Sequence, residues 1–537
     1  MGEQEAQRPH DETTRWLLDY LGERPYWHRE FMDEYYFPLA EGETEDEVGL
    51  ALLATGNFRY VCPNWGLFPF NCPLNCPQPT DPLCPSDCKF GEEWHHERLE
   101  TRAGWQIRKD GDDDIITTFF DSGIFLPGSP PTEHPDLSNL AQYRRLGYNS
   151  VKNPVTQPPP GWEDPNDITA VDMVDFIGPA GHGIPVAGAA AATGNNAEGV
   201  CGVGWSLRYR MVKIVDDTNF ASPLAYAANV WHGMEVMAEG GDRVFSYSWH
   251  TADFIPPNGS CDQAIQQFWQ AWEDNTVELK QTYPDLLIFI AGGNSGEAYC
   301  DAYSAMTMVG GTMLDGNDEV IYDLGSGQRT SEGEWIGVMA PAVNIWSTRK
   351  IIPLDTICPN AIYCGVTGTS FAAPQVAALA NLIWCMDDTL DDDEVLNFIL
   401  GGCESFTGYD PDLHGAGRIN VFNSLALASG DLWTRTPNPG LADDDNVLKA
   451  AGALEGAIVR FYFGTSSGST SVSGCSLSVD IANATLLGST AAGANGSATI
   501  SVSVPSTWAG QTVYLQVVEI GNPCRKSTLV TYAFPSL

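Results

Sequence analysis

The stretch at residues 365–385 constrains the fold of this chain more than any other, because a short polar start leads into a long apolar run. It contains the letters G-T-S-F-A-A-P followed by Q-V-A-A-L-A-N-L-I-W-C. Pro374 falls in the first turn, which tolerates proline, and a helix that is apolar almost all round is buried. We therefore predict a central helix with Ser370 at its N-terminus, where free N–H groups and the helix dipole favour negative charge.

Two further stretches carry residues that fit nucleophilic catalysis. Residues 115–123 contain a β-type apolar run that ends at Asp121, and residues 181–188 read G-H-G-I-P-V-A-G around His182. Taken singly, Ser370 fits a helix cap, Asp121 a turn and His182 a glycine-rich helix start. Peptide hydrolysis, however, needs a nucleophile, a base to take its proton and an orienting carboxylate. The three stretches together supply these groups.

In the order Asp, His, Ser, these stretches resemble the three motifs of the subtilisin-like serine peptidases, the subtilases. The resemblance covers residues 90–430 and implies that Ser370 is the nucleophile, His182 the general acid and base, and Asp121 the carboxylate that orients it. Residues 288–296, I-F-I-A-G-G-N-S-G, resemble the family's Ala-Ala-Gly-Asn motif. This motif implies that Asn294 donates a hydrogen bond to the oxyanion, opposite the Ser370 N–H group.

The same resemblance implies where a peptide substrate binds. The segment S-Y-S-W-H at residues 246–250 matches the strand against which the family lays an extended peptide. Trp249 and His250 are bulkier there than the family's Leu and Gly, and I-P follows H-G at residues 184–185 where the family usually has Thr-His. The implied substrate-binding residues are Ser248, Trp249 and His250 on this strand, and Ala291, Gly292 and Gly293 on the opposing pocket wall.

A structural calcium ion is also implied by the resemblance. Asp136 matches a calcium-binding aspartate of many subtilases, and the loop G-N-N-A-E-G-V at residues 194–200 resembles the family's calcium loop. Calcium takes six to eight oxygens from mixed ligands, and a simple turn is the alternative interpretation of the loop. We expect no cofactor for catalysis. The further calcium ligands would be the side chain of Asn196 and the carbonyl groups of Gly194, Glu198 and Val200.

Adjacent histidines at His95 and His96 suggest a metal site, but the resemblance gives them a structural role. They lie in W-H-H-E, which resembles the start of a subtilase catalytic domain.

Strand-like and helical stretches alternate along the region that resembles the family. This alternation predicts an α/β fold with a doubly wound parallel sheet. From residue 440 onward, Gly, Ser, Thr, Ala and Val dominate, and alternating patterns predict an all-β, sandwich-like domain. The predicted strands lie at 115–120, 211–215, 244–248, 286–291, 306–310, 335–339, 459–463, 498–504 and 512–518, and predicted helices at 222–238, 261–283 and 394–400.

These patterns divide the chain into four parts. Residues 1–65 resemble the second half of a subtilase pro-region, which in the family assists folding and occupies the active site until it is cut. A zymogen is therefore expected, and an accessory N-terminal cap is the alternative. Residues 66–93 form a Cys- and Pro-rich connector, residues 94–430 the catalytic domain and residues 440–537 a β-rich accessory domain.

Composition bears on compartment and partners. The 27 Lys and Arg against 69 Asp and Glu give a net charge of −42, which argues against nucleic acid as a partner. Fourteen cysteines, five of them within residues 62–88, favour disulfides over zinc sites and hence an oxidising compartment. Residues 1–3 lead into no signal-peptide h-region, so either a signal peptide was removed or export uses another route. The candidate disulfide pairs are Cys385–Cys403, Cys358–Cys364 and Cys475–Cys524, the last being the two cysteines of the β-rich C-terminal part.

The sequence thus indicates a secreted, extracellular serine endopeptidase that acts on polypeptides. We expect a monomer without a membrane span, because no apolar run is long enough to cross a bilayer. Two alternatives remain. The same triad could hydrolyse esters or non-peptide amides, or the chain could be a secreted binding or adhesion protein with a latent peptidase domain.

Overall fold

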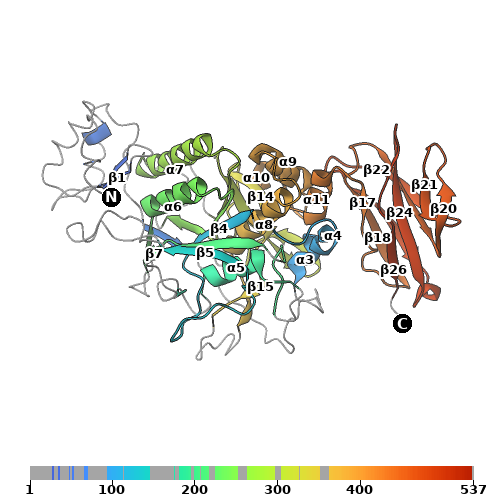
Figure 1. Ribbon diagram of the computed structural model, residues 1–537, viewed down its shortest axis with the longest axis horizontal. Coiled ribbons are helices and arrows are strands. Elements are labelled where there is room, and N and C mark those ends of the chain that lie inside the picture. Colours follow the sequence, from blue (N-terminus) through green and yellow to red (C-terminus); the bar gives the residue numbers. More distant parts are fainter. Residues whose placement is uncertain are drawn as a thin grey trace.

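A parallel sheet with helices on both faces is followed in the chain by a set of antiparallel β sheets (Figure 1). The structure is a computed structural model. It describes residues 27–29, 34–36, 48, 51–53, 66–69, 93–112, 114–145, 174–175, 181–194, 199–205, 207–216, 224–251, 263–296, 304–325, 327–350 and 362–534.

The central sheet has eight strands. They are β4 (Ile116–Asp121), β5 (Leu140–Arg145), β6 (Arg208–Lys213), β9 (Val244–Tyr247), β11 (Leu287–Ala291), β12 (Thr307–Asp315), β13 (Asp318–Ile321) and β14 (Ile336–Pro341). Their order is β13-β12-β11-β9-β4-β6-β5, with β14 also paired to β12. All neighbours are parallel except β12 and β13. Parallel pairing requires crossover connections, which helices supply here.

Helices cover both faces of this sheet. In β11, Leu287 and Phe289 belong to one apolar core and Ile288 and Ile290 to another. The first core includes side chains of α5 (Gly183–Ala191) and α8 (Ala373–Trp384), and the second includes those of α6 (Ala227–Glu239) and α7 (Gln263–Thr282). Because successive residues of a strand point to opposite faces, the two cores lie on opposite sides. The doubly wound parallel sheet is therefore confirmed.

The predicted central helix is α8. All of its residues are buried, and Pro374 lies in its first turn. The short 3-10 segment η2 (Thr369–Phe371) precedes it and carries Ser370. The apolar composition of the run explains this position, because α8 packs against β9 and β11 and neighbours α5.

A smaller sheet differs from the sequence-based expectation. Its order is β10 (Trp249–Thr251), β3 (Gly66–Pro69), β8 (Leu224–Tyr226) and β7 (Val215–Asp216). The helix expected over 222–238 begins only at Ala227, because the backbone of residues 224–226 pairs with β3 and β7. Pairing between distant segments thus overrides the local helical pattern.

Short elements complete the first part of the chain. These are β1 (Trp27–Arg29), β2 (Glu34–Tyr36), α3 (Trp94–Arg98), α4 (Thr101–Gly104), β15 (Ile345–Thr348), β16 (Tyr363–Val366), α9 (Asp392–Gly402), α10 (Pro411–His414) and α11 (Val421–Ser429). Among the described helices, none has both the length and the hydrophobicity needed to cross a lipid bilayer. The sequence pattern also predicts a helix at 13–21 and a strand at 58–62, and both ranges lie outside the described residues.

The C-terminal part is built from antiparallel sheets. Its main strands are β17 (Trp433–Thr434), β18 (Asp444–Ala451), β19 (Ile458–Gly464), β20 (Ser467–Ser471), β21 (Ser478–Ile481), β22 (Thr485–Ala491), β23 (Ala498–Val504), β24 (Thr512–Ile520), β25 (Arg525–Lys526) and β26 (Val530–Ala533), with the 3-10 segment η3 (Ser506–Trp508). Leu448 of β18 and Phe461 of β19 share one apolar core although their strands belong to different sheets. A core between two sheets is the arrangement of a sandwich.

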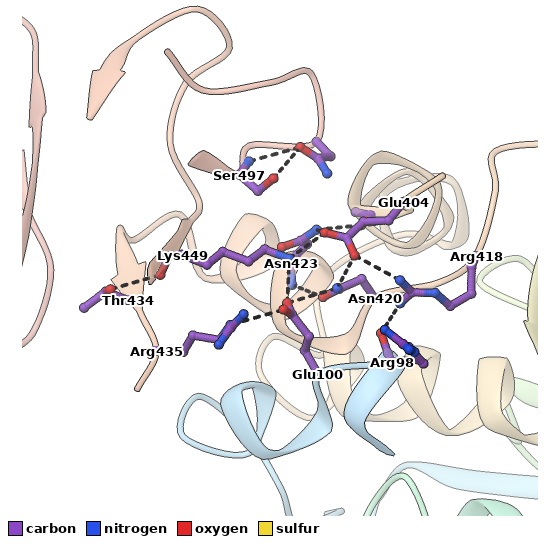
Figure 2. Close-up of polar contacts among 12 residues, drawn as sticks. Arg98, Glu100, Glu404, Arg418, Asn420, Asn423, Thr434, Arg435, Lys449 and Ser497 are labelled. Carbon is purple, nitrogen blue, oxygen red and sulfur yellow. Dashed lines mark hydrogen bonds and ion pairs between the residues drawn. The ribbon is translucent and has the colours of Figure 1, made fainter. Parts of the chain in front are cut away.

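Buried charges connect the two parts of the molecule (Figure 2). Nζ of Lys449, on β18, lies 2.5 Å from Glu100 Oε2 and 2.5 Å from Glu404 Oε1. Arg418 pairs with Glu404 at 3.1 Å, and Asn420 donates a hydrogen bond to each of the two glutamates at 3.0 Å. These contacts link the turn before α4, the chain after α9 and a strand of the C-terminal sandwich.

The cysteines give one confirmed pair and one correction. Cys475 and Cys524 form the predicted disulfide. Cys385 and Cys403 are free thiols, so the pair predicted between them is wrong. The Cys385 thiol instead donates a hydrogen bond to Asn381 Oδ1 at 3.2 Å, and the Cys403 thiol donates one to the carbonyl oxygen of Ile399 at 3.3 Å. Cys358 and the cysteines of residues 62–88 lie outside the described residues, so their pairing stays a prediction.

Candidate active site

Asp121 and His182 meet at the carboxyl edge of the central sheet. Asp121 is the last residue of β4, and His182 caps the N-terminus of α5. The Nδ1 atom of His182 lies 2.8 Å from Asp121 Oδ1, within hydrogen-bond distance. Gly183 permits this approach, since a Cβ there would lie 2.2 Å from the carbonyl oxygen of Gly123.

A second carboxylate, Asp175, holds the segment around His182. Its Oδ2 accepts hydrogen bonds from the backbone N–H of His182 at 2.8 Å and of Ile184 at 3.1 Å. Its Oδ1 accepts one from the Ser122 hydroxyl at 2.8 Å. Sequence reasoning missed Asp175. An aspartate upstream of a helix is a cap signal, but a distance of seven residues is longer than a local cap spans.

Charge around His182 favours its protonated form. Burial by itself lowers the pKa of this imidazole, but the Asp121 carboxylate, its hydrogen bond and the charge of Asp175 outweigh that effect. The pKa of His182 is therefore raised above its usual value of 6.5. An imidazole held in this way can accept a proton at Nε2 and keep Nδ1–H directed at the carboxylate.

Ser370 lies on η2, which contacts α5. The carbonyl oxygen of Ser370 accepts a hydrogen bond from the Ser248 hydroxyl at 3.0 Å, and its own hydroxyl lies 3.4 Å from the carbonyl oxygen of Ser248. The ring of Phe371, the next residue, has its centroid 6.0 Å from that of His182. Among the described residues, Nε2 of His182 has no hydrogen-bond partner. It is thus the nitrogen available to a nucleophile.

Asn294 directs an amide group into the same region. Its Oδ1 accepts the backbone N–H of Thr369 at 2.7 Å and lies 3.2 Å from the Thr369 hydroxyl. Within the described part of the chain, the buried Nδ2 of Asn294 has no partner. This orientation leaves a side-chain donor for a negatively charged oxygen beside η2.

The residues expected on the pocket wall follow β11 directly. Gly292 donates to Val309 O at 2.8 Å, and Gly293 donates to the Thr369 hydroxyl at 3.0 Å. Gly293 has a φ of 107°, a conformation that favours glycine. Ala291 is the last residue of β11. The hydrogen bond from Gly293 to Thr369 therefore connects this wall to η2.

The strand expected to bind substrate is already paired. In β10, Trp249 and His250 pair antiparallel with Pro69 and Phe68 of β3. The other edge of β3 pairs with β8. The indole of Trp249 is buried and meets the ring of His182 edge-on, with centroids 5.7 Å apart. The chain's own residues 66–69 therefore lie along the strand that a peptide would pair with.

The expected calcium residues are partly described. Asp136 is fully buried, and its Oδ2 accepts the backbone N–H of Val200 at 3.0 Å. Gly194 donates to Trp205 O at 3.0 Å, which fixes the start of the loop. Asn196 and Glu198 lie outside the described residues. The buried carboxylate of Asp136 is an oxygen ligand of the kind that calcium prefers.

This chain is similar in sequence to a known protein family and to several characterised proteases. The sequence profile of the Subtilase family matches residues 114–401. Subtilisin Savinase of Lederbergia lenta is 27% identical over 244 residues, which cover 45% of this chain and 76% of that protein. Serine protease AprX of Bacillus subtilis is 24% identical over 359 residues, covering 62% of this chain and 70% of that protein. Alkaline protease of Shouchella clausii is 27% identical over 244 residues, but the match spans only 54% of its length.

A solved structure resembles the fold. The crystal structure of fervidolysin from Fervidobacterium pennivorans, a keratinolytic enzyme related to subtilisin, matches with a TM-score of 0.54 and 14% identity. The match covers 94% of this chain and 69% of that one. At this identity the likeness concerns the fold alone.

Proposed function

This chain belongs to the subtilase family of serine peptidases, and from that premise we propose that it is a secreted endopeptidase that cleaves polypeptides through an acyl-enzyme on Ser370. The observation that carries the proposal is the pairing of His182 Nδ1 with Asp121 Oδ1 at 2.8 Å, which leaves Nε2 unpaired among the described residues.

In the proposed mechanism the Ser370 hydroxyl attacks the carbonyl carbon of a peptide bond while His182 Nε2 takes its proton. Asp121 keeps the imidazole oriented and stabilises the imidazolium. The tetrahedral oxyanion is held by Asn294 Nδ2 and the Ser370 backbone N–H. His182 then protonates the leaving amine, and the acyl-enzyme is hydrolysed when His182 takes a proton from water.

The proposed zymogen gains support from the paired edge of β10. Residues 66–69 add a strand where an extended peptide substrate would pair, and strand addition of this kind is a common mode of peptide recognition. The expected pro-region ended at residue 65, so the proposed blocking segment extends into the connector. Cleavage between this segment and α3 would let it leave and free the edge of β10.

Three further proposals concern a structural ion, the compartment and the division of the chain into domains. A structural calcium ion would be held by Asp136 with carbonyl groups of the loop at residues 194–200, where the Asp136 carboxylate already meets one end of the loop. Extracellular location is supported by the Cys475–Cys524 disulfide, since disulfides persist in oxidising compartments. The division into catalytic residues 94–430 and accessory residues 440–537 is supported by their separate apolar cores.

Labelling with a fluorophosphonate tests the function. The activated chain should react at one serine and cleave casein internally, and Ser370→Ala should lose both labelling and cleavage while keeping its melting temperature. Ser122→Ala and Ser248→Ala should still be labelled. A Ser370→Ala variant that retains full activity would overturn the mechanism, and labelling without peptide cleavage but with ester cleavage would identify another hydrolase.

A further inference from the structure

A compact group of potential metal ligands lies at the start of α3, in Glu93, His95 and His96. All three residues are buried, with exposed fractions of 3%, 0% and 1%. One carboxylate oxygen and one ring nitrogen from each histidine lie within 4.8 Å of one another. Among the described residues, this is the only group of three or more such side chains.

Within the described residues, the ring nitrogens of His95 find no hydrogen-bond partner. The His95 side chain is fully buried. A neutral imidazole carries one N–H donor and one lone pair, and burying both without partners is unfavourable. As a neutral ring, this imidazole can offer its lone pair to a cation.

Hydrogen bonds around His96 fit a second ligand. The Thr101 hydroxyl donates to the backbone oxygen of His96 at 3.2 Å, so its oxygen can accept a hydrogen bond from His96 Nδ1, 2.9 Å away. In that tautomer His96 Nε2 carries no proton. It then faces the carbonyl oxygen of Cys201 at 2.9 Å and the Glu93 carboxylate at 3.8 Å. These three groups, His96 Nε2, the Cys201 carbonyl oxygen and the Glu93 carboxylate, all offer electron pairs, and a cation between them would remove their mutual repulsion.

We propose that Glu93, His95 and His96 bind a divalent transition-metal ion of the zinc type, with the carbonyl oxygen of Cys201 close enough to complete the site. Two imidazoles and a carboxylate suit zinc, whereas calcium prefers oxygen ligands alone. Neighbouring ligands in a tetrahedral zinc site lie about 3.3 Å apart, given bonds of about 2.0–2.2 Å. The 3.8 Å separation of Glu93 and His96 is near this value, and small side-chain rotations would close the remainder.

The ion would have a structural role. Its ligands join the first turn of α3 to the segment at Cys201, which follows the loop that carries Val200. The site lies among apolar and aromatic side chains, with the ring of Trp105 centred 5.3 Å from that of His96. A metal here would fasten the start of the peptidase region to its body, and this inference does not depend on the proposed catalytic roles.

Metal content and metal-dependent stability of the full chain test the proposal. The protein would carry Ser370→Ala only to prevent self-digestion, and all samples would contain excess calcium. After equilibration with zinc and gel filtration, we expect one zinc per chain by plasma mass spectrometry. The chelator 1,10-phenanthroline, which binds zinc but not calcium, should lower the melting temperature. Cobalt should give visible d–d absorption typical of four- or five-coordinate ligation.

Variants separate this site from adventitious binding. His95→Gln and Glu93→Gln should each lower zinc content at least tenfold and abolish the response to phenanthroline. His414→Gln is the matched control, because His414 is also buried and lies 3.0 Å from the carboxylate of Glu332. It should keep its zinc. Absence of zinc and of the cobalt spectrum in the parent protein would overturn the proposal, as would equal zinc content in the parent and both cluster variants.

Discussion

At the scale of single residues, Asn294 places an amide hydrogen-bond donor in the candidate site, and Asp175 places a negative charge there. Asn294 is an amide whose oxygen is occupied by Thr369, so that its Nδ2 is the end available to substrate. Asp175 is a carboxylate that meets the backbone of His182 and adds negative charge behind the imidazole. The first would act on the transition state and the second on the base.

Replacing Asn294 with Ala should lower kcat with little change in KM. The amide would stabilise an oxyanion that exists only in the transition state and its flanking intermediates, so ground-state binding is spared. In subtilisin, a relative of this chain, loss of one such donor costs ~10²–10³ in kcat. Steady-state kinetics on a peptide substrate would measure both constants. A raised KM with unchanged kcat would make Asn294 a binding residue instead.

Asp175→Asn should move the acid limb of the pH profile of kcat/KM to lower pH. Catalysis requires neutral His182, and its raised pKa sets the pH below which activity falls. Removing a nearby negative charge destabilises the imidazolium, so the pKa of His182 should fall.

Ser122→Ala provides the comparison for this shift, because it removes a hydrogen bond to Asp175 but keeps the charge. It should leave the acid limb in place. An unchanged pH profile in Asp175→Asn, with lower stability alone, would show that Asp175 only supports the helix.

At the scale of elements, the buried carboxylate of Asp136 contacts the segment that follows α5. The Asp136 carboxylate bonds the N–H of Val200, and the Asp136 carbonyl oxygen accepts the N–H of Thr193 at 2.9 Å. Asp136 therefore contacts both sides of the loop at residues 194–200.

Calcium should raise the melting temperature through this loop. A ligand that binds only the folded state stabilises it by about 2.7 kcal/mol at 100 times its Kd. EGTA should lower the melting temperature of the Ser370→Ala protein, and added calcium should restore it. Asp136→Asn keeps an oxygen for Val200 but removes the charge, so it should respond to neither reagent. Identical melting of the parent protein in EGTA and in calcium would mean that the loop is only a turn.

At the scale of the whole molecule, the charges in Figure 2 hold the C-terminal sandwich against the peptidase fold. Glu100, which adopts a left-handed φ of 51°, lies between Lys449 and Asn420. A left-handed conformation costs an ordinary residue roughly 1–2 kcal/mol. The contacts of Glu100 with β18 offset that cost only when both parts are folded together. Apolar contact between Phe422 of α11 and Ala451 of β18 adds to the same interface.

The stability that Glu404 contributes should depend on acid pH. Burial by itself raises the pKa of Glu404, but the charges of Lys449 and Arg418 outweigh it and lower the pKa to about 2 from an ordinary 4.5. Because the folded value is the lower one, the contribution is complete above pH 4.5 and is lost as pH falls toward 2. At neutral pH the contribution is on the order of 1–3 kcal/mol.

Glu404→Gln should therefore be less stable than the parent near pH 7, and the difference should shrink between pH 4.5 and 2. Urea unfolding at several pH values would measure it. Asp480→Asn serves as a control, because Asp480 pairs with Lys526 at an exposed surface and should change stability little. A difference between parent and Glu404→Gln that does not vary with pH would contradict a role for the charge.

Much of the fold follows from patterns within short segments. Buried parallel strands read as continuous apolar runs, and β4, β9 and β11 were predicted within a residue or two. The helix α8, all of whose residues are buried, could also be predicted, because its composition leaves no polar face. Asp121, His182, Ser370 and Asn294 were singled out because their motifs resemble those of the subtilases, and each lies at or close to the end of such an element. These features depend on nearest neighbours in the chain, and local sequence encodes them.

Only the tertiary structure decided which distant groups meet. Asp175 bonds to His182 seven residues further on, residues 67–69 of β3 pair with residues 249–251 of β10, and Lys449 of β18 pairs with Glu100. The thiols of Cys385 and Cys403 bond to their own helices although their positions suggested a disulfide. Such contacts depend on how packed elements direct their side chains, and no local pattern of residues specifies that direction.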